Sequence, residues 1–417
     1  MHWFSFLNLK SLNSESRAKR VYLDYASAPP VLPVAERAMR EAHAYYGNPG
    51  AIHREGVEAK RVLEDARARV ASLLGVKPRE VVFTSGLTES NNVAILGLAR
   101  RLACQGVTLR ETHWIVSSIE HSSVLECFGE IERLGGIVTH IDPDSRGIIS
   151  PESIARALRP ETVLVSIGWG NNEIGTLQPL REISQLISTH EKVHSSTILL
   201  HSDAGQALLY SATLVHSLGV DLLSIGSNKL YGPHGIGALC LSKRAEISGV
   251  ILGGKQERGI RAGTENIALA SGFAAAFEQI AFEREAESKR IGALRDEFAR
   301  DIQSRIEGVH INGDLRFTMP HMLNISIPEI NSEYVTLALD SKGVAVSTKS
   351  ACREGEESQS HVVYQLGDVK NSVSSVVLMK EERARNTLRF SLGRDTRAGD
   401  LRKTAEILAD IVHRTPR

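Results

Sequence analysis

Cysteine is scarce in this sequence, with four residues in a chain of 417: Cys104, Cys127, Cys240 and Cys352. They form no C-x-x-C pair, and no cysteine–histidine cluster has the spacing of a zinc site. We therefore expect neither a disulfide framework nor a metal site. Scattered cysteines favour a reducing compartment, so we expect a cytoplasmic protein.

The chain also lacks an excess of charge of either sign, because 49 lysines and arginines balance 49 aspartates and glutamates. No overall field would attract nucleic acid or an anionic membrane. No apolar run approaches the roughly 20 residues that a bilayer-spanning helix needs. We expect a protein that binds neither nucleic acid nor a membrane, with residues 1–20 forming a polar extension rather than an organellar presequence.

Short apolar runs alternate with helical stretches from Val21 to about Ile251. The runs are "EVVFTSG", "HWIVSSIEH", "GIVTHID", "TVLVSIGWGNN", "TILLHSDAGQ" and "DLLSIGSNK". Several are apolar throughout, as in strands buried on both faces, and the alternation predicts an α/β domain with a mostly parallel sheet covered by helices.

The rest of the chain predicts a second, smaller domain. Residues 267–306 are almost uninterrupted helix formers, and the shorter strand-like runs "HMLNISI" and "TLRFSLG" follow them. We predict a polar extension over 1–20, a large α/β domain over 21–266 and a small α+β domain over 267–417. The polar segment 347–361, which contains Cys352, reads as a loop of the small domain.

Polar side chains follow several of the predicted strands, and Lys229 stands between an apolar run and the glycine-rich "GPHGIG". Since the carboxyl ends of parallel strands meet at one edge of a sheet, these residues predict a single pocket there. They are Thr88, His121, Asn172, Asp203, Gln206 and Lys229.

Each of these residues also has an ordinary structural interpretation. An aspartate at a strand end is often a turn residue, a histidine is often simply hydrogen-bonded, and Thr88 could cap its helix. Together they match the requirements of pyridoxal phosphate. Asp203 would pair with the pyridinium nitrogen, Lys229 would hold the aldehyde as an imine, and His121 would lie over the ring.

Ten motifs, from "YLDYASAPPV" through "GNPGAIHREG", "FTSGLTESNN", "SIEHSSVL", "GNNEIG", "SDAGQ", "SNKLYGPHGIGAL", "RAGTEN" and "SAC" to "LRFSLGR", resemble those of the cysteine desulfurase family. This family is the NifS-like branch of the fold-type I pyridoxal-phosphate enzymes, also called class V aminotransferases. The resemblance runs from Tyr22 to Arg394 and rests on the order and spacing of the motifs. It implies the fold-type I α/β architecture with pyridoxal 5'-phosphate as cofactor.

The resemblance also implies roles for individual residues. Lys229 matches the Schiff-base lysine, Asp203 the pyridine partner, His121 the stacking histidine and Thr88 a phosphate ligand. Asn172 and Gln206 match side chains that contact the ring hydroxyl side and the substrate. Thr264 matches a residue that reaches the phosphate of the other subunit, which implies a homodimer.

Two further matches concern the substrate and its sulfur. Arg389 matches the clamp for the substrate carboxylate, and Cys352 matches the persulfide-forming cysteine. Lys349 and Arg353 flank Cys352 and favour a thiolate, whereas we expect the other three cysteines to lie in more apolar settings.

The sequence departs from the family pattern around the phosphate. Gly226 and Asn228 stand where the family usually has a serine and a histidine, so Ser227 or Asn228 would have to hold the phosphate. The usual "AATTP" is "ASAPP" here, which removes hydroxyls near the pocket, and the segment 368–386 is longer than typical.

We therefore expect a homodimeric cysteine desulfurase that converts L-cysteine to L-alanine and leaves a persulfide on Cys352. The sulfur would pass to an iron–sulfur scaffold or a tRNA-thiolation carrier. Two alternatives stay open: a selenocysteine or cystine lyase on the same fold, which would not need Cys352, and a degenerate paralogue that binds partners without catalysis.

Overall fold

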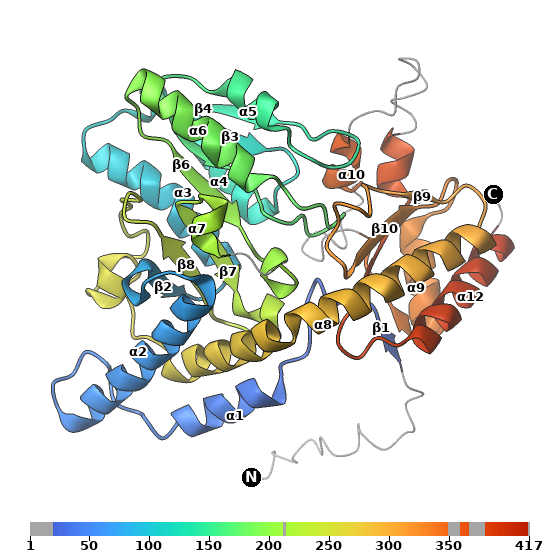
Figure 1. Ribbon diagram of the computed structural model, residues 1–417, viewed down its shortest axis with the longest axis horizontal. Coiled ribbons are helices and arrows are strands. Elements are labelled where there is room, and N and C mark those ends of the chain that lie inside the picture. Colours follow the sequence, from blue (N-terminus) through green and yellow to red (C-terminus); the bar gives the residue numbers. More distant parts are fainter. Residues whose placement is uncertain (1–19, 212–213, 349–358, 367–379, 416–417) are drawn as a thin grey trace, which may run out of the picture.

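A seven-stranded sheet forms the centre of the molecule, with the strand order β2-β8-β7-β6-β5-β3-β4 (Figure 1). The computed structural model describes residues 20–211, 214–348, 359–366 and 380–415. The strands of the sheet are β2 (Val81–Thr84), β3 (His113–Ser117), β4 (Ile137–Ile141), β5 (Thr162–Ser166), β6 (Leu199–Asp203), β7 (Leu222–Gly226) and β8 (Gly237–Leu241). All but β8 run in one direction, so the mostly parallel sheet predicted from the sequence is confirmed.

Strand β8 was not predicted, because its residues follow directly on a glycine-rich turn and its run of five is short. It lies antiparallel between β7 and β2. Gly237 opens it and passes so close to the β2–α3 turn that a Cβ there would lie 2.8 Å from the carbonyl carbon of Gly86. The glycine therefore lets this strand approach the edge of the sheet where the predicted polar residues lie.

Successive side chains along each strand point to opposite faces of the sheet, so they pack into two separate hydrophobic cores. Ile115, Val165 and Leu223 pack on one face, and Trp114 and Leu164 pack on the other. Helices α3 (Leu87–Cys104) and α4 (Ser122–Arg133) cover the second face. The first is covered by α1 (Pro33–Ala42), α2 (Arg54–Leu74), α5 (Pro151–Ala157), α6 (Leu180–His194), α7 (Val215–Leu218) and part of α8 (Ile267–Arg305).

Helix α8 has 39 residues and connects the large sheet to a second group of elements (Figure 1). It packs against α1 and α2 and also against α12 (Ala398–Arg414). The second group contains the antiparallel sheet β12-β10-β9. The strands of this sheet are β9 (His310–Ile311), β10 (Met322–Ser326) and β12 (Thr387–Ser391), and the group also contains α9 (Ser332–Ser341), β11 (Val344–Ala345) and α10 (His361–Gln365).

The first described strand, β1 (Val21–Tyr22), pairs in parallel with β11 rather than with the large sheet. Asp24 continues this association through a bridge to Ser391 of β12. The chain thus runs along the small group of elements before it reaches α1. Residues 21–28 consequently lie between the two parts, while the division at residue 266 stays a prediction.

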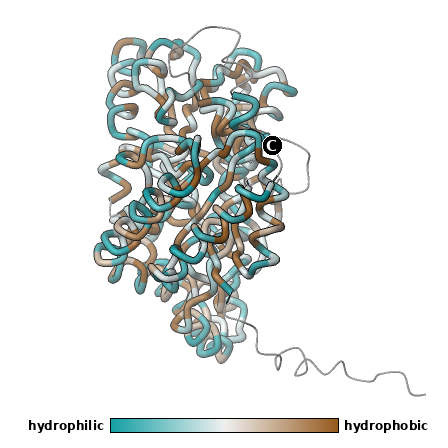
Figure 2. The backbone as a smooth tube through the Cα atoms, turned by 90° about the vertical axis from the view of Figure 1, so that its right-hand side faces the viewer, coloured by the Kyte–Doolittle hydropathy of each residue, from teal (hydrophilic) through white to brown (hydrophobic). Residues whose placement is uncertain are grey.

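Apolar residues form the interior of both parts. Hydrophilic and hydrophobic residues alternate along the helices, as is typical of helices with one buried face (Figure 2). Among the described helices, none is both long and apolar enough to cross a bilayer.

Candidate active site

A cavity of about 390 Å³ opens at the carboxyl ends of β2, β3, β5, β6 and β7. Ala26 and Ser27 from the amino-terminal segment line it, as does Arg389 from β12. It therefore lies between the two parts of the molecule, at the edge where the sequence predicts a pocket. Eight predicted residues line this cavity: Thr88, His121, Asn172, Asp203, Gln206, Asn228, Lys229 and Arg389.

Two predicted residues that the structure describes, Ser227 and Thr264, are not part of this lining. Ser227 is fully buried, and its Oγ lies only 2.2 Å from where a Cβ on Gly232 would be, so its hydroxyl faces that glycine. Thr264 is exposed in the segment before α8. Cys352 lies outside the described residues. The roles expected for Thr264 and Cys352 stay predictions.

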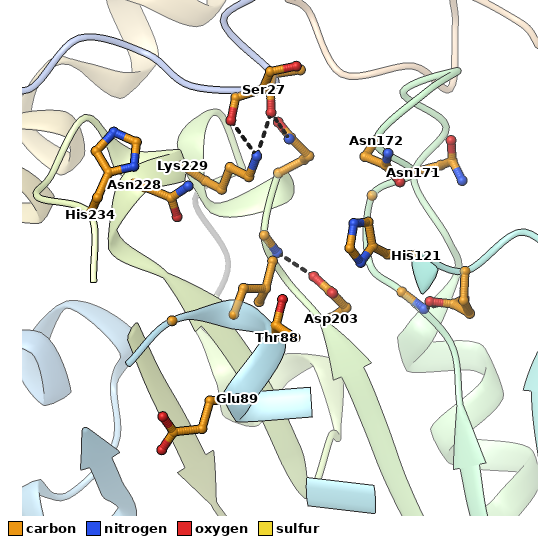
Figure 3. A pocket seen from close by; sticks show the side chains of 18 of the residues that line it. Ser27, Thr88, Glu89, His121, Asn171, Asn172, Asp203, Asn228, Lys229 and His234 are labelled. Atoms are coloured by element: carbon orange, nitrogen blue, oxygen red, sulfur yellow. Dashed lines mark hydrogen bonds between the residues drawn. The ribbon is translucent and has the colours of Figure 1, made fainter. Parts of the chain in front are cut away.

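Lys229 lies just beyond β7, in the 3-10 turn Ser227–Leu230. Its ammonium Nζ reaches into the cavity and donates hydrogen bonds to the carbonyl oxygens of Ala26, at 2.8 Å, and Ser27, at 2.7 Å (Figure 3). The Ala26 carbonyl also accepts a hydrogen bond from Gln206 Nε2 at 2.8 Å. The amino-terminal segment thus provides the contacts that hold the lysine within the site.

The first turn of α3 forms another wall of the cavity. Its N-cap is Gly86, with φ of 152°, and Thr88 lies at the second helical position, so Thr88 is not the cap. The first N–H groups of a helix have no partner within the helix, and its dipole is positive there. Glu89 in the same turn pairs with Arg261 at 2.9 Å. Burial acts to raise the pKa of Glu89, but hydrogen bonds from Arg261 and Ser85 outweigh it and lower that pKa.

Asp203 ends β6, and a chain of hydrogen bonds connects it to His121. Asn91 Nδ2 donates to Asp203 Oδ2 at 2.7 Å and to Ser123 Oγ at 2.9 Å. Ser123 Oγ lies 2.9 Å from His121 Nδ1, which also accepts the Ser123 backbone N–H at 3.1 Å. His121 Nδ1 is therefore an acceptor, and the neutral ring carries its proton on Nε2.

Burial lowers the pKa of His121, and the neighbouring Lys229 and His361 lower it further, against the opposing effect of Asp203. The ring is accordingly neutral near pH 7. Sequence reasoning missed Asn91 and Ser123, although both lie within quoted motifs, because only the packing of α3 against α4 brings them together.

Glu120 is a second residue that sequence reasoning missed. It lines the cavity, it is only 5 % exposed, and its Oε1 accepts the backbone N–H of Gly168 at 2.8 Å. Burial, with a smaller contribution from the charge of Asp203, raises the pKa of Glu120 to about 8. This carboxyl group is therefore mostly protonated near pH 7 and adds little charge beside Asp203.

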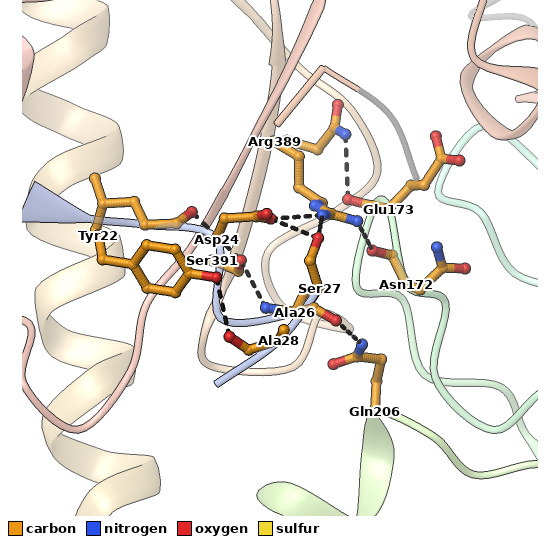
Figure 4. Close-up of polar contacts among 12 residues, drawn as sticks. Tyr22, Asp24, Ala26, Ser27, Ala28, Asn172, Glu173, Gln206, Arg389 and Ser391 are labelled. Carbon is orange, nitrogen blue, oxygen red and sulfur yellow. Dashed lines mark hydrogen bonds and ion pairs between the residues drawn. The ribbon is translucent and has the colours of Figure 1, made fainter. Parts of the chain in front are cut away.

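Arg389 is 1 % exposed and is held from both parts of the molecule (Figure 4). Its Nη1 donates to the carbonyl oxygen of Asn172 at 3.0 Å. Its Nη2 donates to Asp24 Oδ1 and to Ser27 Oγ, each at 2.7 Å. The "ASAPP" segment brings one hydroxyl to the pocket, that of Ser27, and the effect of the hydroxyls that it lacks stays a prediction.

Residues 360–363 are attached beside the cavity. Ser360 Oγ donates to the buried Glu173 carboxylate at 2.5 Å, and His361 Nε2 donates to the carbonyl oxygen of Glu120 at 3.0 Å. Val362 and Val363 of α10 pack with Ile119 and Ile174. These contacts fix position 360 next to the residues that line the site.

The other cysteines differ in their surroundings. Cys127 and Cys240 are buried, and burial raises the pKa of each thiol to about 12, so neither forms a thiolate near pH 7. Cys104 was expected in an apolar setting, but it is exposed because it is the last residue of α3.

Fold and site together define a fold-type I α/β enzyme with a lysine at the end of β7, and comparison with known proteins gives the same class. The sequence profile of the class-V aminotransferases matches residues 21–403. Cysteine desulfurase IscS of Dictyoglomus turgidum is 38% identical over 397 residues, which is 95% of this chain and 95% of that protein. Cysteine desulfurase IscS of Aeromonas salmonicida is 39% identical over 400 residues, covering 94% and 93%.

Solved structures agree with this class. A NifS-like protein superimposes with a TM-score of 0.83 at 30% identity, covering 94% of this chain and 99% of that one. A structure described as SspA in complex with cysteine has a TM-score of 0.75 at 33% identity, covering 89% and 98%. The chain belongs to the class-V aminotransferase family and, within it, to the cysteine desulfurases.

Proposed function

We propose that this protein uses pyridoxal phosphate to convert L-cysteine to L-alanine and transfers the sulfur to Cys352. The observation that carries the proposal is the presence, in one cavity, of Lys229 from the large sheet and Arg389 from the small one. A buried arginine suits the carboxylate of an amino acid, and a lysine that lines the same cavity can act as a nucleophile or base there once it is deprotonated.

Three observations indicate that these residues fit the cofactor. The first turn of α3 provides N–H groups and a positive dipole for a phosphate, and the absence of a Cβ on Gly237 lets β8 pack closely against the Gly86 backbone at the start of this turn. Asp203 is fixed by Asn91 and can hold the proton of a pyridinium nitrogen. His121 is neutral and can lie against an aromatic ring without adding charge.

When bound, pyridoxal phosphate withdraws electrons from the α-carbon of the amino acid. The residues of the chain would then bind and move protons. Lys229 would take the α-proton and return it, Arg389 would hold the carboxylate, and His121 would donate or accept a proton through Nε2.

Sulfur transfer requires no external oxidant. The Cys352 thiolate would attack the substrate sulfur, a sulfur–sulfur bond would form and the carbon–sulfur bond would break. The substrate carbon gains a proton and leaves as L-alanine, and Cys352 retains one additional sulfur atom. The atoms of L-cysteine and the thiol are thus all present in L-alanine and the persulfide.

The wider setting also belongs to this proposal. We infer a homodimer in which Thr264 reaches the phosphate site of the partner, because Thr264 is exposed and lies outside the lining of its own cavity. We infer a reducing, cytoplasmic location, supported by three free thiols among the described residues. The persulfide would pass to a sulfur-acceptor protein of iron–sulfur cluster assembly or tRNA thiolation.

The test is to measure L-alanine formation from L-cysteine by the wild-type protein, Lys229→Ala and Lys229→Arg. Both variants should lose activity by several orders of magnitude, because no other described lysine lines the cavity. Lys229→Arg is the matched control, since it keeps a positive charge that can contact the carbonyls of Ala26 and Ser27. If either variant forms L-alanine near the wild-type rate, the proposed role of Lys229 is wrong.

A further inference from the structure

We propose that the Ser27 hydroxyl occupies the place on Arg389 that the substrate carboxylate takes, and gives it up when the substrate binds. Ser27 would then set the affinity of the carboxylate subsite. This inference rests on the proposed function, because it takes Arg389 as the carboxylate anchor.

The donors of Arg389 are already largely used. A guanidinium has five N–H donors. Nη2 uses both of its hydrogens, one for Asp24 Oδ1 and one for Ser27 Oγ, and Nη1 uses one for the carbonyl oxygen of Asn172. Nε is buried and has no hydrogen-bond partner among the described residues.

A carboxylate binds a guanidinium best through two parallel hydrogen bonds. Every pair of parallel N–H donors on Arg389 includes Nη2, because the side-chain carbon Cδ, bonded to Nε, blocks the edge between Nε and Nη1. A bidentate carboxylate therefore has to replace one of the two acceptors on Nη2. The unpartnered Nε gives it a second donor without further displacement.

Ser27 is the acceptor that can leave. Asp24 carries a charge, pairs with Arg389 at 2.7 Å and is also tied to β12 through its bridge to Ser391. The Ser27 hydroxyl is neutral, and a neutral acceptor is the weaker partner of a guanidinium. It lies 2.8 Å from Asp24 Oδ1, to which it donates, so it keeps one hydrogen bond after leaving Arg389.

The same residue also contacts the lysine, because the Ser27 carbonyl oxygen accepts from Lys229 Nζ at 2.7 Å. Ser27 thus faces both the group that would meet the carboxylate of the substrate and the group that acts at its amine (Figures 3 and 4). The Ser27 hydroxyl bonds to Arg389, whereas the Ser27 carbonyl oxygen bonds to Lys229. Comparing a ligand that has a carboxylate with one that lacks it therefore isolates the effect of the hydroxyl.

The experiment is isothermal titration calorimetry of the cofactor-loaded protein with L-alanine and with ethylamine, two amines that differ only in the carboxylate. The variants are Ser27→Ala and Ser27→Val, which lack the hydroxyl, and Ser27→Thr, which keeps it and matches valine in shape. We expect the first two to bind L-alanine about tenfold more tightly than the wild type, the lower end of the effect of removing one hydrogen bond to a charged group. Ethylamine binding should be unchanged, and Ser27→Thr should behave as the wild type.

Weaker or unchanged binding of L-alanine to both Ser27→Ala and Ser27→Val would overturn the inference, as would an equal gain for ethylamine. The valine–threonine pair keeps the test decisive if Ser27→Ala is poorly folded. A wild-type protein that does not prefer L-alanine over ethylamine would instead overturn Arg389 as the anchor. In that case the proposed function fails, and the inference fails with it.

Discussion

The pKa of Glu120, raised by burial from an ordinary 4.5 to about 8, makes the stability of the protein depend on pH. Below pH 4.5 this group is protonated in both the folded and the unfolded chain, so its full contribution to stability is present. As the pH rises, the unfolded chain loses the proton while the folded protein keeps it, and that stability is lost progressively up to about pH 8. At about 1.4 kcal/mol per pH unit, the loss approaches roughly 5 kcal/mol as an upper limit.

Replacing Glu120 by glutamine should remove this dependence. The amide oxygen can still accept the N–H of Gly168, and the side chain is neutral at every pH. We expect Glu120→Gln to match the wild type near pH 4.5 and to be more stable by several kcal/mol near pH 8.

Urea unfolding of the cofactor-loaded protein, followed by tryptophan fluorescence at both pH values, measures the difference. The exposed Glu111 supplies the control, because Glu111→Gln should leave the pH dependence unchanged. If Glu120→Gln shifts the free energy of unfolding equally at both pH values, Glu120 is ionised in the folded protein and the interpretation is wrong.

Two further predictions concern the part of the cavity where the phosphate of the cofactor is proposed to bind. Gly237→Ala would place a Cβ 2.5 Å from the Ile225 carbonyl oxygen and 2.8 Å from the Gly86 carbonyl carbon, so it should cost about 1–3 kcal/mol of stability and speed cofactor loss. Gly129→Ala in α4, where a Cβ meets nothing within 4 Å, is the matched control and should be neutral or slightly stabilising; equal effects of the two changes would contradict the close approach. Asn228→His should slow the loss of pyridoxal phosphate during dialysis against a competing amine by up to about tenfold, because a histidine can make a charge-assisted hydrogen bond to a phosphate. Loss at the parent rate would mean that other groups hold the phosphate.

Much of the fold could be predicted from the sequence because strands buried on both faces are apolar throughout. Runs such as "TVLVS" are visible without any knowledge of their neighbours. The rule that parallel strands end at one edge of a sheet also predicts that Thr88, His121, Asp203 and Lys229 lie together, and all four line the cavity. Strand β8 was missed because a short apolar run after a glycine-rich turn resembles the end of a loop.

The supporting contacts of the site could not be predicted, because they join distant parts of the chain. Asp24 and Arg389 are 365 positions apart, and the pairing of β1 with β11 is what brings the amino-terminal segment to the cavity. The raised pKa of Glu120 depends on its burial, and the "SIEH" motif alone does not show that this glutamate is buried. Local patterns thus identified groups that could act chemically, whereas tertiary packing decides which neighbours hold them.

The most direct test of the proposed function is one incubation of the wild-type protein with L-cysteine, without added reductant. L-alanine is quantified, and the site of any additional sulfur is located by peptide mass spectrometry. We predict that L-alanine forms and that the additional sulfur lies on the peptide containing Cys352. Additional sulfur on Cys104 instead, L-alanine without any persulfide on Cys352, or no L-alanine at all would contradict it.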